Sequence, residues 1–148
     1  MRRFFVFAAL CAGLIALAGA PARAEILIAV NKSAQSMTVV VDGRDRYHWP
    51  VSTGTGGGPP SGAYRPDRME RTWYSRRYHW SPMPHAIFFH EGYAIHGTYA
   101  VSRLGTPASH GCVRLLPAHA AELFALVRSQ GMGGTRIVVS GSSRTAWR

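Results

Sequence analysis

Short apolar runs separated by turn-forming residues dominate the sequence that follows residue 24. Residues 26–30 form one such run, and residues 37–41 are rich in β-branched side chains, which favour strands. Asp42-Gly43 comes directly after the second run and is a strong signal for a two-residue hairpin turn. We therefore expect a β-hairpin, with residues 46–52 continuing as a third strand.

A second hairpin and a last strand are predicted further along the chain. Residues 86–89 and 93–95 are apolar and flank Glu91-Gly92, another turn pair. Residues 135–139 form a final β-branched run. Residues 54–62 are rich in glycine and proline, which predicts a loop rather than a strand.

One segment has the apolar spacing of a helix. Pro117 suits a first helical turn, because its φ is already helical and its missing N–H is not needed there. Apolar residues then recur every three or four positions, at Ala120, Leu123, Phe124 and Val127. We expect this helix to end near Gly131. Several short strands, one helix and no internal repeat predict a single mostly β domain.

The first residues have the layout of a secretory signal peptide. Two arginines precede an uncharged, mostly apolar run at residues 4–20, and a small-x-small sequence ends at Ala24. We expect cleavage after Ala24, which leaves a domain at residues 25–140 and a polar C-terminal tail at residues 141–148. A retained membrane anchor is the alternative, although the apolar run is short for a membrane span.

The net charge of +10 bears on partners rather than on fold. A basic protein attracts polyanions, but the sequence contains no nucleic-acid-binding motif, so no nucleic-acid partner is expected. An anionic wall polymer or a membrane surface fits the charge better. Residues 65–80 combine arginines with tryptophans and tyrosines. They are either an exposed cationic and aromatic surface or a long loop held in place by its aromatic side chains.

The mature chain would contain a single cysteine. Of the two cysteines, Cys11 lies in the predicted signal, so Cys112 has no partner for an internal disulfide. A free cysteine is often buried as a small apolar side chain. It can also be a nucleophile, when a base favours the thiolate and nearby donors receive an oxyanion. His96 is a candidate base, and Gly111 would allow tight backbone geometry beside the thiol. Spacing alone leaves both readings of Cys112 open.

Two short motifs surround the candidate base and thiol. They are Ile95-His96-Gly97-Thr98 and Ser109-His110-Gly111-Cys112-Val113-Arg114-Leu115. Together they resemble the signature of the L,D-transpeptidase family, the YkuD-type catalytic domain. Residues 60–64 are also similar to the family's Thr-Pro-x-Gly strand entry, with the threonine replaced. The likeness covers roughly residues 25–139.

The resemblance implies a catalytic role for several motif residues. Cys112 would be the nucleophile that forms a thioester, and His96 would be the general base, oriented through the carbonyl of Gly97. Gly111 and Cys112 would supply the amides that receive the oxyanion. His110 would help to shape the catalytic site.

The resemblance also implies a fold, a substrate and a location. Ser109 and Arg114 would lie on the substrate side, where Arg114 could pair with a substrate carboxylate. The fold would be a β-sandwich with one principal helix after the active cysteine. No cofactor and no metal are implied, since cysteine and histidine suffice for acyl transfer.

The implied activity is that of an exported peptidoglycan L,D-transpeptidase in the periplasm or cell envelope. The donor would be a tetrapeptide stem that loses D-Ala, and an amine acceptor would give a 3-3 cross-link. With water as acceptor the same thiol would give a carboxypeptidase or endopeptidase, and with a protein amine it would anchor an envelope protein to the wall. Two further alternatives remain: a non-catalytic basic wall-binding module, and a metal site built from His90, His96, His110 and Cys112.

Overall fold

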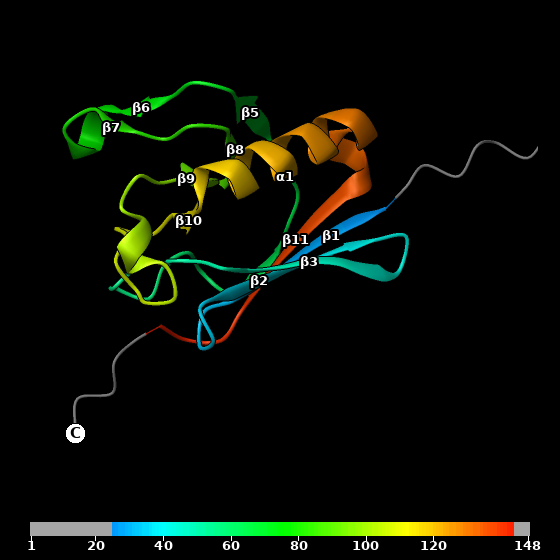
Figure 1. The fold of residues 1–148 in the computed structure, drawn as a ribbon, viewed down its shortest axis with the longest axis horizontal. Coiled ribbons are helices and arrows are strands. Elements are labelled where there is room, and N and C mark those ends of the chain that lie inside the picture. The colour runs from blue at the N-terminus through cyan, green and yellow to red at the C-terminus, as the bar shows by residue number, and fades with distance from the viewer. Residues whose placement is uncertain (1–24, 144–148) are drawn as a thin grey trace, which may run out of the picture.

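The computed structural model describes residues 25–143 (Figure 1). The predicted signal peptide at residues 1–24 and the last five residues of the predicted tail lie outside the described residues. Within the described range, no helix is long and apolar enough to cross a membrane.

The larger sheet has five strands in the order β3-β2-β1-β11-β4. Its central pair joins the first and last strands of the domain, because β1 pairs with β11 in parallel. β1 also pairs with β2, and β2 with β3, in antiparallel fashion. The bounds are β1 Ile26–Asn31, β2 Ser36–Val41, β3 Arg44–Pro50, β4 Gly62–Tyr64 and β11 Thr135–Ser140.

The first predicted hairpin is confirmed. Asp42 and Gly43 join β2 to β3 with φ values of 51° and 75°, as a type I′ turn requires. The third strand, however, ends at Pro50 rather than at the predicted residue 52. Pro50 pairs with Ser36, the first residue of β2, so no residue of β2 is left to pair with beyond it. The Val51 N–H donates instead to the carbonyl of Gln35 in the turn before β2. Ser52 forms a bridge with Arg114 of the second sheet instead.

The second sheet has four strands in the order β10-β9-β8-β5. β8 and β9 form the second predicted hairpin, with Glu91 and Gly92 at positive φ in the turn. β9 and β10 are parallel, and this pairing places His96 opposite Arg114. The bounds are β5 Arg68–Glu70, β8 Ala86–His90, β9 Tyr93–Gly97 and β10 Val113–Leu115.

The predicted helix is confirmed as α1, Pro117–Gln130. Pro117 occupies its first turn, and the chain leaves the helix at Gly131 with φ at 89°. α1 lies over the inner face of the five-stranded sheet and contacts β9 and β8 (Figure 1). The ring of Trp49 on β3 stacks on that of His119 on α1, with the ring centroids 4.7 Å apart.

One hydrophobic core joins the two sheets and the helix. The apolar residues that were predicted to form the helix's inner face are the buried residues of α1. They pack in one cluster with alternate residues of β1 and with residues of β8, β9 and β10. The fold is therefore a mostly β structure with two main sheets, a small two-stranded sheet and one principal helix, and the mostly β class with one helix was predicted from the sequence.

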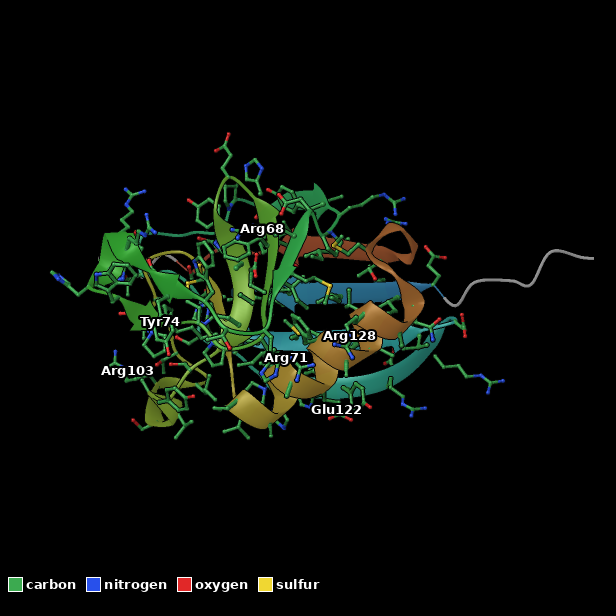
Figure 2. All side chains as sticks on the ribbon, turned by 90° about the horizontal axis from the view of Figure 1, so that it is seen from above. Arg68, Arg71, Tyr74, Arg103, Glu122 and Arg128 are labelled. Atoms are coloured by element: carbon green, nitrogen blue, oxygen red, sulfur yellow. The ribbon has the colours of Figure 1, made fainter. Side chains whose placement is uncertain are left out.

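A flap connects β5 to β8. We use this name for residues Tyr74–Pro82, which contain β6 Tyr74–Ser75, the 3-10 turn Arg76–Tyr78 and β7 Ser81–Pro82. The flap lies at one end of the molecule, as does the 3-10 turn Val101–Arg103 (Figure 1). Figure 2 shows Tyr74 and Arg103 at this end, away from Glu122 and Arg128 on α1. A third 3-10 turn, Met132–Gly134, links α1 to β11.

Both readings of residues 65–80 hold for part of the segment. Trp73 packs edge-on against Phe88, with the ring centroids 5.7 Å apart, and Arg68 lies over both rings. This part of the segment is held in place by its aromatic side chains. Trp80 is 62% exposed and has the guanidinium of Arg76 over its ring, so the flap itself is cationic, aromatic and open to solvent.

Candidate active site

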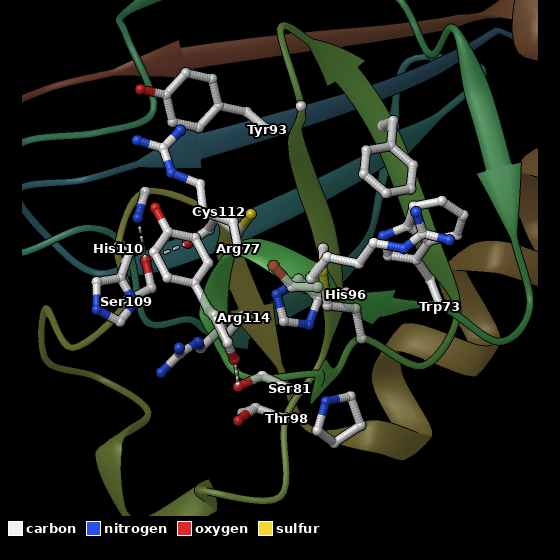
Figure 3. A pocket seen from close by; sticks show the side chains of 18 of the residues that line it. Trp73, Arg77, Ser81, Tyr93, His96, Thr98, Ser109, His110, Cys112 and Arg114 are labelled. Carbon is white, nitrogen blue, oxygen red and sulfur yellow. Dashed lines mark hydrogen bonds between the residues drawn. The ribbon is translucent and has the colours of Figure 1, made fainter.

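A cleft of about 780 Å³ separates the flap from the loop that precedes β10. Cys112 and His96 both line it, as do Ser109, His110 and Arg114 (Figure 3). His96 comes from the end of β9, and Cys112 is the residue immediately before β10. Because β9 and β10 are neighbours in parallel, residues from distant parts of the sequence meet in one cleft.

His96 is buried and held in one orientation. Its Nδ1 lies 2.7 Å from the carbonyl oxygen of Gly97. A carbonyl can only accept, so Nδ1 carries the proton and donates, and Nε2 is left as the basic nitrogen. Burial lowers the pKa of His96 to about 4; the hydrogen bond to Gly97 raises the pKa and the charge of Arg114 lowers it further. At neutral pH the imidazole is therefore uncharged and able to accept a proton.

Cys112 is half-buried and its thiol is protonated at neutral pH. Burial raises the pKa of Cys112, while a hydrogen bond with the backbone of Ala94 and the charge of Arg114 lower it by less. One side of the residue packs against a small apolar cluster formed by Met83, Ala86, Phe88 and Ala94. The cysteine thus has apolar neighbours and also lines the cleft.

The backbone before Cys112 forms a tight turn around the side chain of Ser109. Ser109 Oγ donates to the Cys112 carbonyl at 2.6 Å and accepts from the Gly111 N–H at 3.0 Å. The Gly111 amide, expected from the resemblance to face an oxyanion, therefore already has an acceptor. No hydrogen bond from the Cys112 N–H is found among residues 25–143. Ser109 is also buried, and its two hydrogen bonds hold the turn in shape.

Gly111 has no room for a side chain. Its φ is +147°, and a Cβ atom there would lie 2.5 Å from Cε1 of Tyr93. Both the backbone conformation and the ring of Tyr93 thus require glycine at this position.

Arg114 and His110 also line the cleft, His110 from within residues Ser109 to Cys112, which we call the catalytic turn, and Arg114 from β10. Arg114 donates from Nη1 to the Ala108 carbonyl at 3.3 Å, and no ion pair of Arg114 is found in the described part of the chain. The exposed ring of His110 stacks on Tyr78 of the flap, with centroids 4.2 Å apart and planes inclined by 10°. His110 is thus the contact between the catalytic turn and the flap.

The structure brings the predicted residues Cys112, His96, Ser109, His110 and Arg114 into one cleft, with Gly97 and Gly111 beside them. His90, part of the alternative metal set, does not line the cleft. Its ring lies near Tyr64 and Tyr93. Among the described residues there is no group of three histidine, cysteine or acidic side chains placed to hold a metal ion.

Sequence reasoning missed two contributors to the site. The flap brings Arg76, Arg77 and Tyr78 to the cleft; their composition was noticeable in the sequence, but nothing there indicated their position. The segment Ser52 to Gly54 was the second omission. It bridges to Arg114 and Ser109, and its only signal was that it lies between a strand and the glycine-rich loop.

Comparisons with known proteins agree with this geometry. The family model of the L,D-transpeptidase catalytic domain (YkuD) matches residues 25–139. The fold is similar to that of an L,D-transpeptidase from Stackebrandtia nassauensis, with a TM-score of 0.70 and 28% identity over 83% of this chain and 58% of that one. An L,D-transpeptidase from Mycobacterium smegmatis aligns with a TM-score of 0.71 and 24% identity over 80% of this chain and 59% of that one.

A third structure of the same fold is L,D-transpeptidase 3 from Mycobacterium tuberculosis in complex with a faropenem-derived adduct. It has a TM-score of 0.69 and 18% identity, and the alignment covers 80% of this chain and 61% of that one. The chain thus spans about three fifths of the length of these solved structures. No curated protein sequence matched.

Proposed function

Because this chain belongs to the L,D-transpeptidase family, we propose that it transfers an acyl group between peptidoglycan stem peptides. A tetrapeptide stem would be the donor, and the side-chain amine of diaminopimelate on a neighbouring stem would be the acceptor, giving a 3-3 cross-link. The observation that carries the proposal is one cleft that holds the Cys112 thiol and a neutral imidazole fixed by Gly97.

The first half-reaction forms a thioester. Cys112 Sγ attacks the carbonyl carbon that precedes the terminal D-Ala, while His96 Nε2 takes the thiol proton. The tetrahedral intermediate collapses when the C–N bond breaks and Nε2 returns the proton to the departing D-Ala nitrogen. Proton transfer during attack is required here, because both groups are uncharged at rest.

The second half-reaction consumes the thioester. The acceptor amine attacks the thioester carbonyl and gives a proton to His96 Nε2. The C–S bond then breaks, the new amide forms and Cys112 recovers its proton. In both half-reactions the negatively charged oxygen of the intermediate needs a hydrogen-bond donor. The Cys112 N–H is available for this, because no other group among the described residues accepts a hydrogen bond from it.

Charge around the cleft supports an anionic peptide as substrate. Four arginines line it, Arg68, Arg76, Arg77 and Arg114, against a single acid, Glu91. Arg68 forms an ion pair with Glu70, with Arg68 Nη1 3.1 Å from Glu70 Oε1. The other three face a cleft that a stem peptide with free carboxylates would enter with favourable electrostatics.

The same chemistry would be carried out in the cell envelope. The signal-peptide layout of residues 1–24 supports export, and peptidoglycan lies outside the cytoplasm. Two other acceptors are compatible with the same thioester: water, which gives a carboxypeptidase or endopeptidase, and a protein amine, which anchors an envelope protein to the wall.

Mass spectrometry of muropeptides distinguishes these acceptors. The mature protein is incubated with purified disaccharide-tetrapeptide, and the products are weighed. Cross-linked dimers that lack one D-Ala support transpeptidation, whereas tripeptide monomers alone would favour water as the acceptor. A faropenem adduct on Cys112 is an independent check, since the Mycobacterium tuberculosis neighbour is described with such an adduct.

The Cys112→Ala variant is the matched control for this assay. We expect it to lose all product formation and to melt close to the wild-type temperature, because the lost sulfur borders a cleft rather than the main core. A melting temperature lowered by many degrees, with activity retained in other cysteine-free variants, would instead support a packing role for Cys112.

A further inference from the structure

The only lysine of the sequence is buried. Lys32 lies in the turn between β1 and β2 and is 5% exposed. Its Nζ donates to the carbonyls of Gly57 and Pro59, each at 2.8 Å. A buried ammonium group is costly unless it is hydrogen-bonded, so these contacts fix one loop firmly to the turn.

That loop rests on the catalytic turn. It is closed by hydrogen bonds from Gly54 N to Gly58 O at 2.9 Å and from Gly57 N to Gly54 O at 3.1 Å. A Cβ atom on Gly54 would lie 2.9 Å from the Gly111 Cα, and one on Gly58 would lie 3.1 Å from it. The loop backbone therefore touches the backbone of Gly111 directly.

Gln35, a second buried side chain of the turn between β1 and β2, is hydrogen-bonded to Thr53, just before the glycine-rich loop. Gln35 donates from Nε2 to Thr53 Oγ1 at 2.7 Å and accepts from the Thr53 N–H at 2.9 Å. The Thr53 carbonyl in turn accepts from the N–H groups of Ala108 and Ser109 at 2.9 and 3.0 Å. Ser109 is the residue that organises the turn around Cys112.

Gly111 is thus enclosed by two neighbours. The loop fixed by Lys32 approaches its Cα, and the ring of Tyr93 occupies the place where its side chain would lie, leaving no space for even a methyl group. The peptide between Gly111 and Cys112 carries the Cys112 N–H. A displacement of the loop would therefore rotate or shift this N–H, even though Lys32 touches neither the thiol nor the cleft.

We propose that Lys32, assisted by Gln35, is a positioning residue that aims the Cys112 N–H at the developing oxyanion by holding the glycine-rich loop against Gly111. The inference rests on the acyl-transfer function proposed above, and it assigns no contact between Lys32 and substrate. It predicts that Lys32 affects acylation of Cys112, where an oxyanion forms, and leaves alkylation of the same thiol unaffected, since alkylation forms none.

The test compares two reactions of one thiol. The full-length mature protein reacts with p-nitrophenyl acetate, which acylates through an oxyanion, and with iodoacetamide, which alkylates by direct displacement. In Lys32→Met, which keeps an unbranched chain and removes the ammonium, we expect acylation to slow about tenfold and alkylation to stay within about twofold. Equal slowing of both reactions, or slowing of neither, would overturn the proposal.

Two glycine variants in the same loop test the proposal even if the Lys32→Met variant does not fold. Gly58→Ala should press on Gly111 and lower acylation selectively, whereas Gly56→Ala should leave both rates unchanged, because its Cβ would meet nothing within 4 Å. Equal behaviour of the two alanine variants would contradict the proposal. If wild type and variants all fail with muropeptides, the proposed substrate is wrong, and the ratio of the two thiol reactions still reports on Lys32.

Discussion

At the scale of single residues, the site keeps both reacting groups uncharged before substrate arrives. Burial lowers the pKa of His96 to about 4 and raises the pKa of Cys112. A resting pair of imidazolium and thiolate would need the opposite shifts. In the proposed mechanism the thiol is therefore activated during attack, and its reactivity would depend on whether His96 can accept a proton.

This dependence sets the acid side of the pH profile. We expect the rate of Cys112 acylation by p-nitrophenyl acetate to rise with a midpoint near pH 4, where His96 loses its proton, and to level off through neutral pH. The rate is measured over a pH series from the release of p-nitrophenol, at a wavelength where its neutral and ionised forms absorb equally. A midpoint near 6.5, the ordinary value for histidine, would show that the base is a solvated imidazole and not the buried one.

The same shift makes the fold sensitive to acid. Between pH 6.5 and about 4 the unfolded chain binds a proton at His96 and the folded chain does not, so the free energy of unfolding falls as the pH is lowered. The loss attributable to His96 is at most about 3 kcal/mol. Urea denaturation at pH 7 and pH 4.5 should show a larger loss for wild type than for His96→Gln, and equal losses would contradict the assignment.

At the scale of elements, the flap and the catalytic turn form the two walls of the cleft. They meet where Tyr78 stacks on His110. Arg76 and Arg77 belong to the exposed wall, so they can reach a substrate without losing an ion pair among the described residues. In the proposed mechanism the flap thus supplies charge, while β9 supplies His96 and the turn before β10 supplies Cys112.

Removal of one flap charge should weaken substrate binding without slowing chemistry. Because Arg77 is exposed, we expect Arg77→Ala to raise the KM for a tetrapeptide donor about fivefold, with kcat unchanged, and the difference should shrink at high salt. Arg128→Ala is the control, since Arg128 lies on α1 outside the cleft. A fall in kcat with unchanged KM would instead place Arg77 in the chemical step.

Elements were predictable where local chemistry decides them. Asp42-Gly43 and Glu91-Gly92 each favour a turn through their own backbone conformations. Pro117 and Gly131 mark the two ends of α1 in the sequence. The end of β3 was not predictable, because it depends on where its partner β2 begins.

At the scale of the whole molecule, one core supports the site. Leu123 on α1 is fully buried in the cluster that also contains Ile95, the residue before His96. We expect Leu123→Ala to lower the free energy of unfolding by about 2–5 kcal/mol, through lost burial and the cavity left behind. Urea denaturation measures this, with the exposed neighbour Glu122→Ala expected to change it by no more than about 0.5 kcal/mol.

The site as a whole was only partly predictable for the same reason. Cys112, His96 and Gly97 were found because they lie within short motifs. Lys32 and Gln35 were not, because their partners Gly57, Pro59 and Thr53 come from another part of the chain and meet them only after the sheet has formed. Contacts across such separations have no local sequence signal.

The parallel pairing of β1 with β11 also has a consequence for biogenesis. The central seam of the larger sheet joins the first and the last strand that the structure describes. β1 therefore exposes one edge until β11 has paired with it, and contacts between such distant segments form slowly. Holdase chaperones that shield β1 during that interval should raise the yield of folded protein, and a fragment that stops before Thr135 should aggregate.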